Sequence, residues 1–187
     1  KKITLPKYLM VGQRRPLEIK KQVVGSTNWQ REIHKMLKAQ DSRPVSGGAD
    51  YFIYPRDLRF PMPSFAVGKL FWDSWFIFYA RSTGVPVINA TPVINTIHQQ
   101  HYHSFEKHAY GELSLGEEAQ TNLRLLGGRE YSLKVFDADY ILTNNGLEKL
   151  KLTTSRLIRR SEIWLLIVAQ QHWVWKPLLW LVENARN

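Results

Sequence analysis

The chain contains no cysteine among its 187 residues. This absence excludes disulfide bonds and thiolate chemistry, and it is compatible with a reducing compartment. Three catalytic signatures are also missing: a glycine-rich phosphate loop, a Gly-x-Ser-x-Gly nucleophile elbow and a zinc-protease histidine pair. Gly47-Gly48 and Gly127-Gly128 are glycine pairs without the continuation that a phosphate loop requires. We therefore expect a cytoplasmic protein that uses neither cysteine chemistry nor any of these three catalytic motifs.

Long apolar runs, internal repeats and low-complexity tracts are absent as well. In the C-terminal part, residues 156–186, the longest uncharged run is Ile163–Trp175, which contains Gln and His and is too short to span a bilayer. The first residues lack the apolar stretch of a signal peptide, and because they start on Lys1 we expect a fragment or a processed product. With 44% hydrophobic and 22% charged residues, the composition is that of a globular protein able to bury a core.

Acidic residues are few relative to basic ones, which leaves a formal net charge of +10. Such an excess favours anionic partners: nucleic acid, anionic lipid or phosphorylated metabolites. The aromatic residues, which include seven Trp, are not interleaved with basic residues as in a nucleic-acid-binding sheet. Nucleic acid is therefore the least favoured of these partners.

Apolar periodicity predicts strands that alternate with helices. Strands are expected at residues 7–12, 50–54, 85–89 and 93–98, with another beginning at 131–136, and helices at 28–40, 69–83 and 117–126. Gly84 and Gly127 follow two of these helices, as is typical of a helix C-terminus. The predicted fold class is α/β, with a mixed sheet flanked by helices.

The C-terminal part differs from the rest of the chain. Residues 156–186 read as helical, are interrupted only at Pro177, and combine basic side chains with Trp164, Trp173, Trp175 and Trp180. Two interpretations stay open. The favoured one is a helix pair packed on the sheet, and the other is a segment that lies on a membrane surface and makes the protein peripheral there.

Most residues with chemical potential lie between Gly48 and His103. Asp73 sits among aromatic rings near the start of a predicted helix. A carboxylate at the mouth of a cleft can accept a proton from a sugar hydroxyl, as general base catalysis requires. The alternative is that Asp73 caps the helix or accepts a hydrogen bond from a backbone amide.

Two further groups resemble metal or phosphate ligands. His98, His101 and His103 follow a predicted strand, and in an extended chain His101 and His103 point to the same side. Solvent-facing or core roles remain equally open for these histidines. Asp137-Ala138-Asp139 has the form of a pair that holds a metal against a diphosphate, but in a chain of this size a structural role is favoured.

Five short blocks follow one another in order along residues 7–145. They are Tyr8–Arg14, Gly48–Phe52, Phe65–Gly68 leading to Trp72–Trp75, Gly84–Thr91, and Ile97–His101. In sequence and order these blocks resemble a nucleotide-diphospho-sugar transferase family with a GT-A-type glycosyltransferase fold. The resemblance implies transfer of a sugar from a nucleotide sugar to a hydroxyl of a glycan or lipid-linked acceptor, usually with a divalent metal such as Mn or Mg.

Site residues follow from the same resemblance. Asp73 becomes a candidate catalytic base or acceptor-binding carboxylate, and His98 or His101 would lie near the metal or the diphosphate. The candidate substrate-binding residues are Arg56, Lys69, Trp72 and Trp75, with a solvated surface charge as the alternative for Arg56 and Lys69. Lys69 stands where the family pattern has Arg, and the two are not equivalent at a bidentate phosphate site. Residues 100–103 read Gln-His-Tyr-His where the pattern has Asn-His-Asp-Tyr, so the acid of that motif is missing.

The nucleotide-binding half of a GT-A fold, with its own Asp-x-Asp, precedes the segment that these blocks resemble. We therefore expect residues 1–150 to be a GT-A-like, acceptor-side portion without that half, and residues 151–187 to be an amphipathic helical tail. The leading hypothesis is the acceptor side of a glycosyltransferase. The competing hypothesis is a non-catalytic basic module that binds anionic membrane or glycan surfaces.

Overall fold

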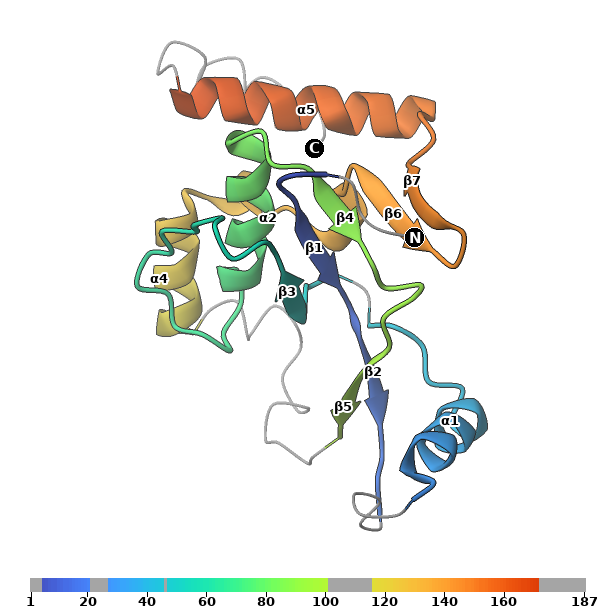
Figure 1. Cartoon of the computed structure of the whole chain (residues 1–187). Helices are drawn as coiled ribbons and strands as arrows, with labels where there is room; N and C mark the ends of the chain where they lie inside the picture. The colour runs from blue at the N-terminus through green and yellow to red at the C-terminus, as the bar shows by residue number, and fades with distance from the viewer. Residues whose placement is uncertain (1–4, 21–26, 46, 101–115, 172–187) are drawn as a thin grey trace.

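The computed structural model describes residues 5–20, 27–45, 47–100 and 116–171. In this part of the chain the elements are β1 (Leu9–Gly12), β2 (Arg14–Leu17), α1 (Trp29–Ala39), β3 (Tyr51–Ile53), α2 (Trp72–Ser82), β4 (Val87–Asn89), β5 (Thr96–Gln99), α4 (Glu117–Leu126), the short 3-10 helices η2 (Arg129–Tyr131) and η3 (Val135–Asp137), β6 (Tyr140–Thr143), β7 (Gly146–Lys149) and α5 (Thr154–Gln171) (Figure 1). The fold is mixed α/β, as the alternation of strand and helix patterns predicts.

The main sheet has five strands in the order β3-β1-β4-β6-β7. β1, β4 and β6 run parallel, whereas β3 and β7 pair antiparallel at the two edges. The central strands are apolar because both of their faces are covered. Leu9, Val11 and Val87 face the main core, and Met10 and Ile88 face a smaller cluster on the other side.

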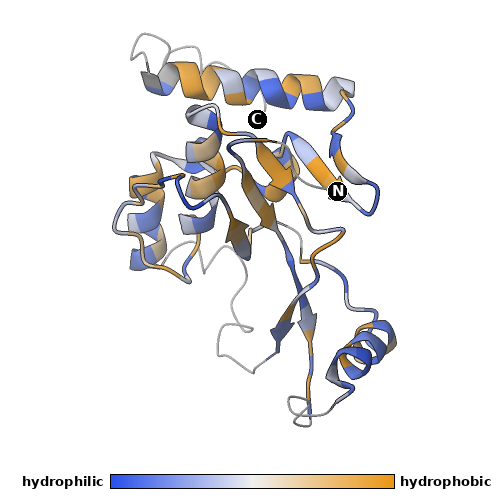
Figure 2. Ribbon diagram, viewed as in Figure 1, coloured by the Kyte–Doolittle hydropathy of each residue, from blue (hydrophilic) through white to orange (hydrophobic). Residues whose placement is uncertain are grey.

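Helix α2 supplies the aromatic part of the main core. Phe76, Ile77 and Phe78 are buried in it, together with residues of α4 and α5. Figure 2 shows the central strands and the inner side of α2 in the colours of apolar residues. Burial of such side chains is the main force that holds these layers together.

A second, two-stranded sheet extends the first one. β2 and β5 pair in parallel, with Arg14 opposite Thr96 and Pro16 opposite His98. β2 follows β1 after one residue, and β5 follows β4 after a short connection. Both chains therefore leave the main sheet at the carboxyl ends of parallel strands, which is where ligand sites form in open α/β sheets.

Two predicted elements differ from those observed. The helix expected from Lys69 begins at Trp72, because Phe71 has φ +80° and cannot belong to a right-handed helix. The strand expected from Tyr131 is instead η2, an extended link and η3. Tyr131, Leu133 and Val135 are buried, whereas the residues between them are only partly buried. The alternating apolar pattern therefore reflects burial of one side of this segment. The backbone bonds of the segment are local, from Tyr131 N–H to the carbonyl of Gly128 and from Asp137 N–H to that of Lys134.

Asp137 and Asp139 attach α5 and α2 to the sheet. The side chain of Asp137 is 0% exposed and accepts hydrogen bonds from Arg159 Nε at 2.8 Å and Arg159 Nη2 at 3.1 Å. Asp139 accepts from Arg81 Nη1 at 2.7 Å and from the Val87 backbone N–H at 3.0 Å. These contacts support the structural role favoured for Asp137-Ala138-Asp139.

Helix α5 begins the tail that the sequence sets apart. Its residues Ile163 and Leu166 are 1% and 4% exposed and belong to the main core. The described half of the tail therefore packs on the body of the protein, whereas residues 172–187 lie outside the described part. Among the helices that the structure describes, none has the length and apolarity needed to cross a bilayer.

Candidate functional site

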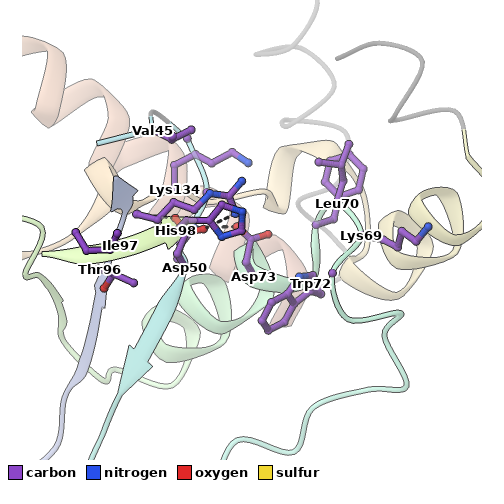
Figure 3. A pocket seen from close by; sticks show the side chains of 16 residues that line it. Val45, Asp50, Lys69, Leu70, Trp72, Asp73, Thr96, Ile97, His98 and Lys134 are labelled. Atoms are coloured by element: carbon purple, nitrogen blue, oxygen red, sulfur yellow. Dashed lines mark hydrogen bonds and ion pairs between the residues drawn. The ribbon is translucent and has the colours of Figure 1, made fainter. Parts of the chain in front are cut away.

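A cavity of about 680 Å³ opens where β2 and β5 leave the main sheet (Figure 3). Residues from five parts of the chain line it: Arg14 on β2, Val45 and Gly47 to Asp50 ahead of β3, Gly68 to Asp73 at the start of α2, Thr96 to His98 on β5, and Lys134 ahead of η3. Of the residues predicted to form the site, the cavity brings together Lys69, Trp72, Asp73 and His98.

Asp73 is held in the first turn of α2. Its Oδ2 accepts a hydrogen bond of 3.0 Å from the backbone N–H of Ala49. A Cβ atom at Gly48 would lie 2.9 Å from the same oxygen, so glycine permits this close approach. Among the described residues, Oδ1 of Asp73 has no hydrogen-bond partner. One oxygen of the carboxylate is therefore fixed, and the other remains available in a cavity at a helix N-terminus.

Asp50 lines the same cavity in a different environment. Its Oδ2 accepts from the backbone N–H of Arg14 at 2.9 Å, and its Oδ1 accepts from Arg14 Nη1 at 3.0 Å. Next to it, burial of the Tyr51 phenol, reinforced by the negative charge of Asp50, raises the pKa of Tyr51 to about 12. The Tyr51 ring covers Gly12, where any Cβ would overlap it. Asp50 is thus occupied in joining β2 to β3.

The cations of the cavity differ in how they are paired. Lys69 Nζ lies 2.6 Å from Glu118 Oε2 on α4, and in Figure 3 its side chain extends away from Asp73. Lys134 has no carboxylate partner among the described residues, and its Nζ lies 3.4 Å from the Ser74 hydroxyl. Lys134 therefore has charge to offer an anionic ligand, although the sequence analysis did not select it. Sixty positions separate it from Ser74, and its local sequence resembles no motif.

His98 lines the cavity from β5 and is partly buried. His101, the other predicted metal ligand, lies outside the described residues. Within the described ranges, no three His, Asp or Glu side chains come close enough to hold a metal ion. The carboxylates that line the cavity together with His98 are those of Asp50 and Asp73, and both already accept backbone hydrogen bonds. The described residues therefore do not fit a divalent metal by themselves.

Two predicted substrate-binding residues lie elsewhere. Arg56 is exposed in the turn after β3 and does not line the cavity. Trp75 is 7% exposed and packs in the core, where its ring stacks on Tyr79 at 4.8 Å between centroids. One helical turn earlier, Trp72 does line the cavity, with its ring edge-on to Phe52 at 5.6 Å. Trp72 thus contributes to the cavity and Trp75 to the core, although they are only three residues apart on α2.

Comparisons with protein-family models, with curated proteins and with solved structures found no match for this chain. Any function must therefore be argued from the chemistry of the cavity. That chemistry consists of one carboxylate with an available oxygen, one indole, one imidazole, and an excess of cations over anions.

Proposed function

We propose that the chain forms the acceptor-side part of a glycosyltransferase with a GT-A-like fold. It would transfer a sugar from a nucleotide sugar to a hydroxyl of a glycan or lipid-linked acceptor. The observation that carries this proposal is the position of Asp73, in a cavity at the carboxyl ends of parallel strands and at a helix N-terminus. A partly buried indole lines the same cavity, together with the ammonium group of Lys134, which has no carboxylate partner among the described residues.

In the proposed reaction Asp73 is the general base. Its Oδ1 accepts the proton of the acceptor hydroxyl while Oδ2 stays bonded to the Ala49 N–H. The acceptor oxygen forms a bond to the anomeric carbon, and the bond from that carbon to the diphosphate breaks. The nucleoside diphosphate then leaves with the bonding electron pair, and the proton remains on Asp73 until solvent removes it.

Other groups of the cavity bind and orient the substrates. The Trp72 ring offers an apolar surface for one face of a sugar. Lys134 and the N-terminus of α2 attract the negative charge of the diphosphate. His98 lies on the β5 wall, in reach of either substrate. A nucleotide-binding segment outside residues 7–145 would complete the donor site.

The test is sugar transfer and nucleotide-sugar hydrolysis by the full-length gene product across the common nucleotide sugars. Asp73→Asn is compared with Asp57→Asn, which alters an exposed carboxylate outside the cavity. We expect the first variant to lose activity and the second to retain it. Equal turnover in the two variants would remove Asp73 from the mechanism, and no transfer or hydrolysis with any donor would contradict a glycosyltransferase.

A second candidate is a non-catalytic module that binds anionic glycans at the same cavity. It is favoured by Lys134, which lines the cavity without a carboxylate partner among the described residues, whereas Arg14 is paired with Asp50 and Lys69 with Glu118. Binding of sulfated or phosphorylated oligosaccharides, measured by calorimetry, separates the two candidates. Asp73→Asn should strengthen such binding if the cavity only binds anions, because the substitution removes a negative charge. A transferase would instead lose turnover in the same variant.

A further inference from the structure

Helix α5 has a second face that the fold does not use. Its inner face is attached by Ile163, Leu166 and the Arg159–Asp137 ion pair. On the outer face, Leu157, Ile158 and Trp164 are 50%, 55% and 62% exposed. Residues 157, 158, 161, 164, 165 and 168 recur at spacings of three and four, and so share one side of the helix. Figure 1 shows α5 lying across one end of the molecule, with the sheet and α2 below it.

Cations lie directly beside these apolar side chains. Arg81 and Arg160 line a hollow of about 590 Å³ together with Leu157, Trp164 and Leu165. Asp139, the acid in that hollow, already accepts hydrogen bonds from Arg81 and from the Val87 backbone N–H. Arg160 Nη2 lies 3.6 Å from Asp139 Oδ1. The hollow therefore keeps an excess of positive charge.

More positive charge lies along the same side of the molecule. Lys149 and Arg160 line a neighbouring hollow, and the partly buried Arg156 precedes Leu157 on the helix. The acidic neighbours are engaged: Glu148 accepts from the Thr143 hydroxyl at 2.6 Å, and Glu162 lies 3.4 Å from Arg159. An apolar strip with a rim of arginine and lysine is the arrangement found in helices that lie in a membrane interface.

We propose that the outer face of α5 docks on an anionic lipid bilayer. Leu157, Ile158 and Trp164 enter the boundary between headgroups and acyl chains, and the flanking cations bind lipid phosphates. A second copy of this chain is a poorer occupant, because a two-fold interface would bring Arg156, Arg160 and Lys149 towards the same cations of the partner. Three exposed apolar side chains also offer less area than a stable dimer needs.

Vesicle co-sedimentation of the full-length gene product tests the apolar strip. Phosphatidylcholine vesicles with and without phosphatidylglycerol are compared, and Leu157→Glu/Trp164→Glu is measured beside the matched control Trp29→Glu/Val67→Glu. The control alters another exposed Trp and another exposed aliphatic residue, at 47% and 62% exposure, and changes the net charge by the same amount. We expect the α5 variant to bind the anionic vesicles at least about tenfold more weakly than the control.

The cationic rim is tested in the same assay. Lys149→Gln/Arg156→Gln is compared with Arg31→Gln/Lys35→Gln, which removes two exposed cations from α1. We expect the rim variant to bind anionic vesicles about tenfold more weakly than the α1 variant, and raising the salt concentration should abolish the difference. Circular dichroism and thermal unfolding verify that each variant is folded.

Three results would overturn the proposal. The first is equal vesicle binding by the α5 variant and its control. The second is equal binding of the wild type to vesicles with and without phosphatidylglycerol. The third is a dimer that the α5 substitutions dissociate while vesicle binding does not change, which would identify a second copy of this chain as the occupant. Because the face lies away from Asp73, loss of vesicle binding with sugar transfer intact would leave the proposed function untouched.

Discussion

Two pairs of carboxylates in this protein have different surroundings in the folded chain. Asp50 and Asp73 line the cavity, whereas Asp137 and Asp139 join the sheet to α2 and α5. Every carboxylate oxygen of the second pair has a donor, and two of those donors are arginines. Asp73 instead keeps an oxygen without a partner among the described residues. General base catalysis needs a carboxylate that is held in place but has an oxygen without a donor, and of these four carboxylates only Asp73 meets both conditions among the described residues.

The largest expected effect is on catalysis at Asp73. Replacement by Asn preserves the hydrogen bond from Ala49 but removes the base, so kcat for sugar transfer should fall by about 10²–10⁴-fold. The free energy of unfolding, measured by urea titration, should change by less than about 1 kcal/mol, because only a helix N-terminal charge is lost. A large loss of stability with normal kcat would place Asp73 with the structural pair.

Asp137 should show the opposite behaviour. Asp137→Ala removes the buried carboxylate that binds Arg159 and leaves the guanidinium with Glu162 at 3.4 Å, so we expect a loss of about 3 kcal/mol in the free energy of unfolding. The exposed residue Asp57 provides the control, since Asp57→Ala should change stability by less than about 0.5 kcal/mol. Turnover per folded molecule should be unchanged in both variants. A specific loss of kcat in folded Asp137→Ala would contradict the division between the two pairs.

Lys134 distinguishes binding from chemistry within the cavity. We expect Lys134→Gln to raise KM for the nucleotide sugar by about tenfold with little change in kcat, because a ground-state phosphate contact is lost. Lys35→Gln, on the exposed side of α1, should leave both constants unchanged. If Lys134→Gln lowered kcat and left KM unchanged, the lysine would act in the transition state rather than in binding.

The smallest effect concerns Tyr51 beside the cavity. Its pKa is raised to about 12, so the unfolded chain releases the phenol proton at lower pH than the folded one. The raised pKa of Tyr51 therefore leaves the free energy of unfolding unchanged below pH 10, and lowers it as pH rises towards 12, by about 1 kcal/mol after allowance for solvent screening. Tyr51→Phe should remove this pH dependence. The measurement compares the free energies of unfolding of the two proteins in urea titrations at pH 9 and about 11. Equal pH dependence of the two proteins would contradict the raised pKa.

Local patterns predicted the regular elements well where the physical cause is itself local. The helices at residues 28–40 and 117–126 were expected within one residue of α1 and α4, because apolar spacing and a terminal glycine act over a few residues. β6 and β7 were not predicted. They form a hairpin at the edge of the sheet, and β6 pairs with β4, which lies 52 positions earlier in the sequence. The alternation of apolar and polar residues at 131–135 likewise results from burial of one side of the segment and not from strand pairing.

The candidate site was predicted only in part. Sequence resemblance selected Asp73, Trp72, Lys69 and His98, which the fold brings to one cavity. It also selected Trp75 and Arg56, because sequence spacing does not reveal which side of α2 faces the core or how far the turn after β3 lies from the cavity. Lys134 was missed for the same reason, since nothing near it in sequence indicates that it lies beside Ser74.

The sequence by itself determined the class of the fold, the lack of cysteine chemistry and the positive charge, because these depend on composition and on short-range periodicity. Tertiary structure decided which carboxylate is available and which is saturated. Asp73 and Asp137 each follow apolar residues and precede small ones, so their neighbours in sequence do not separate them. Arg159 reaches Asp137 across 22 positions and Ala49 reaches Asp73 across 24, and only the packing of α2, α5 and the sheet brings those donors into contact.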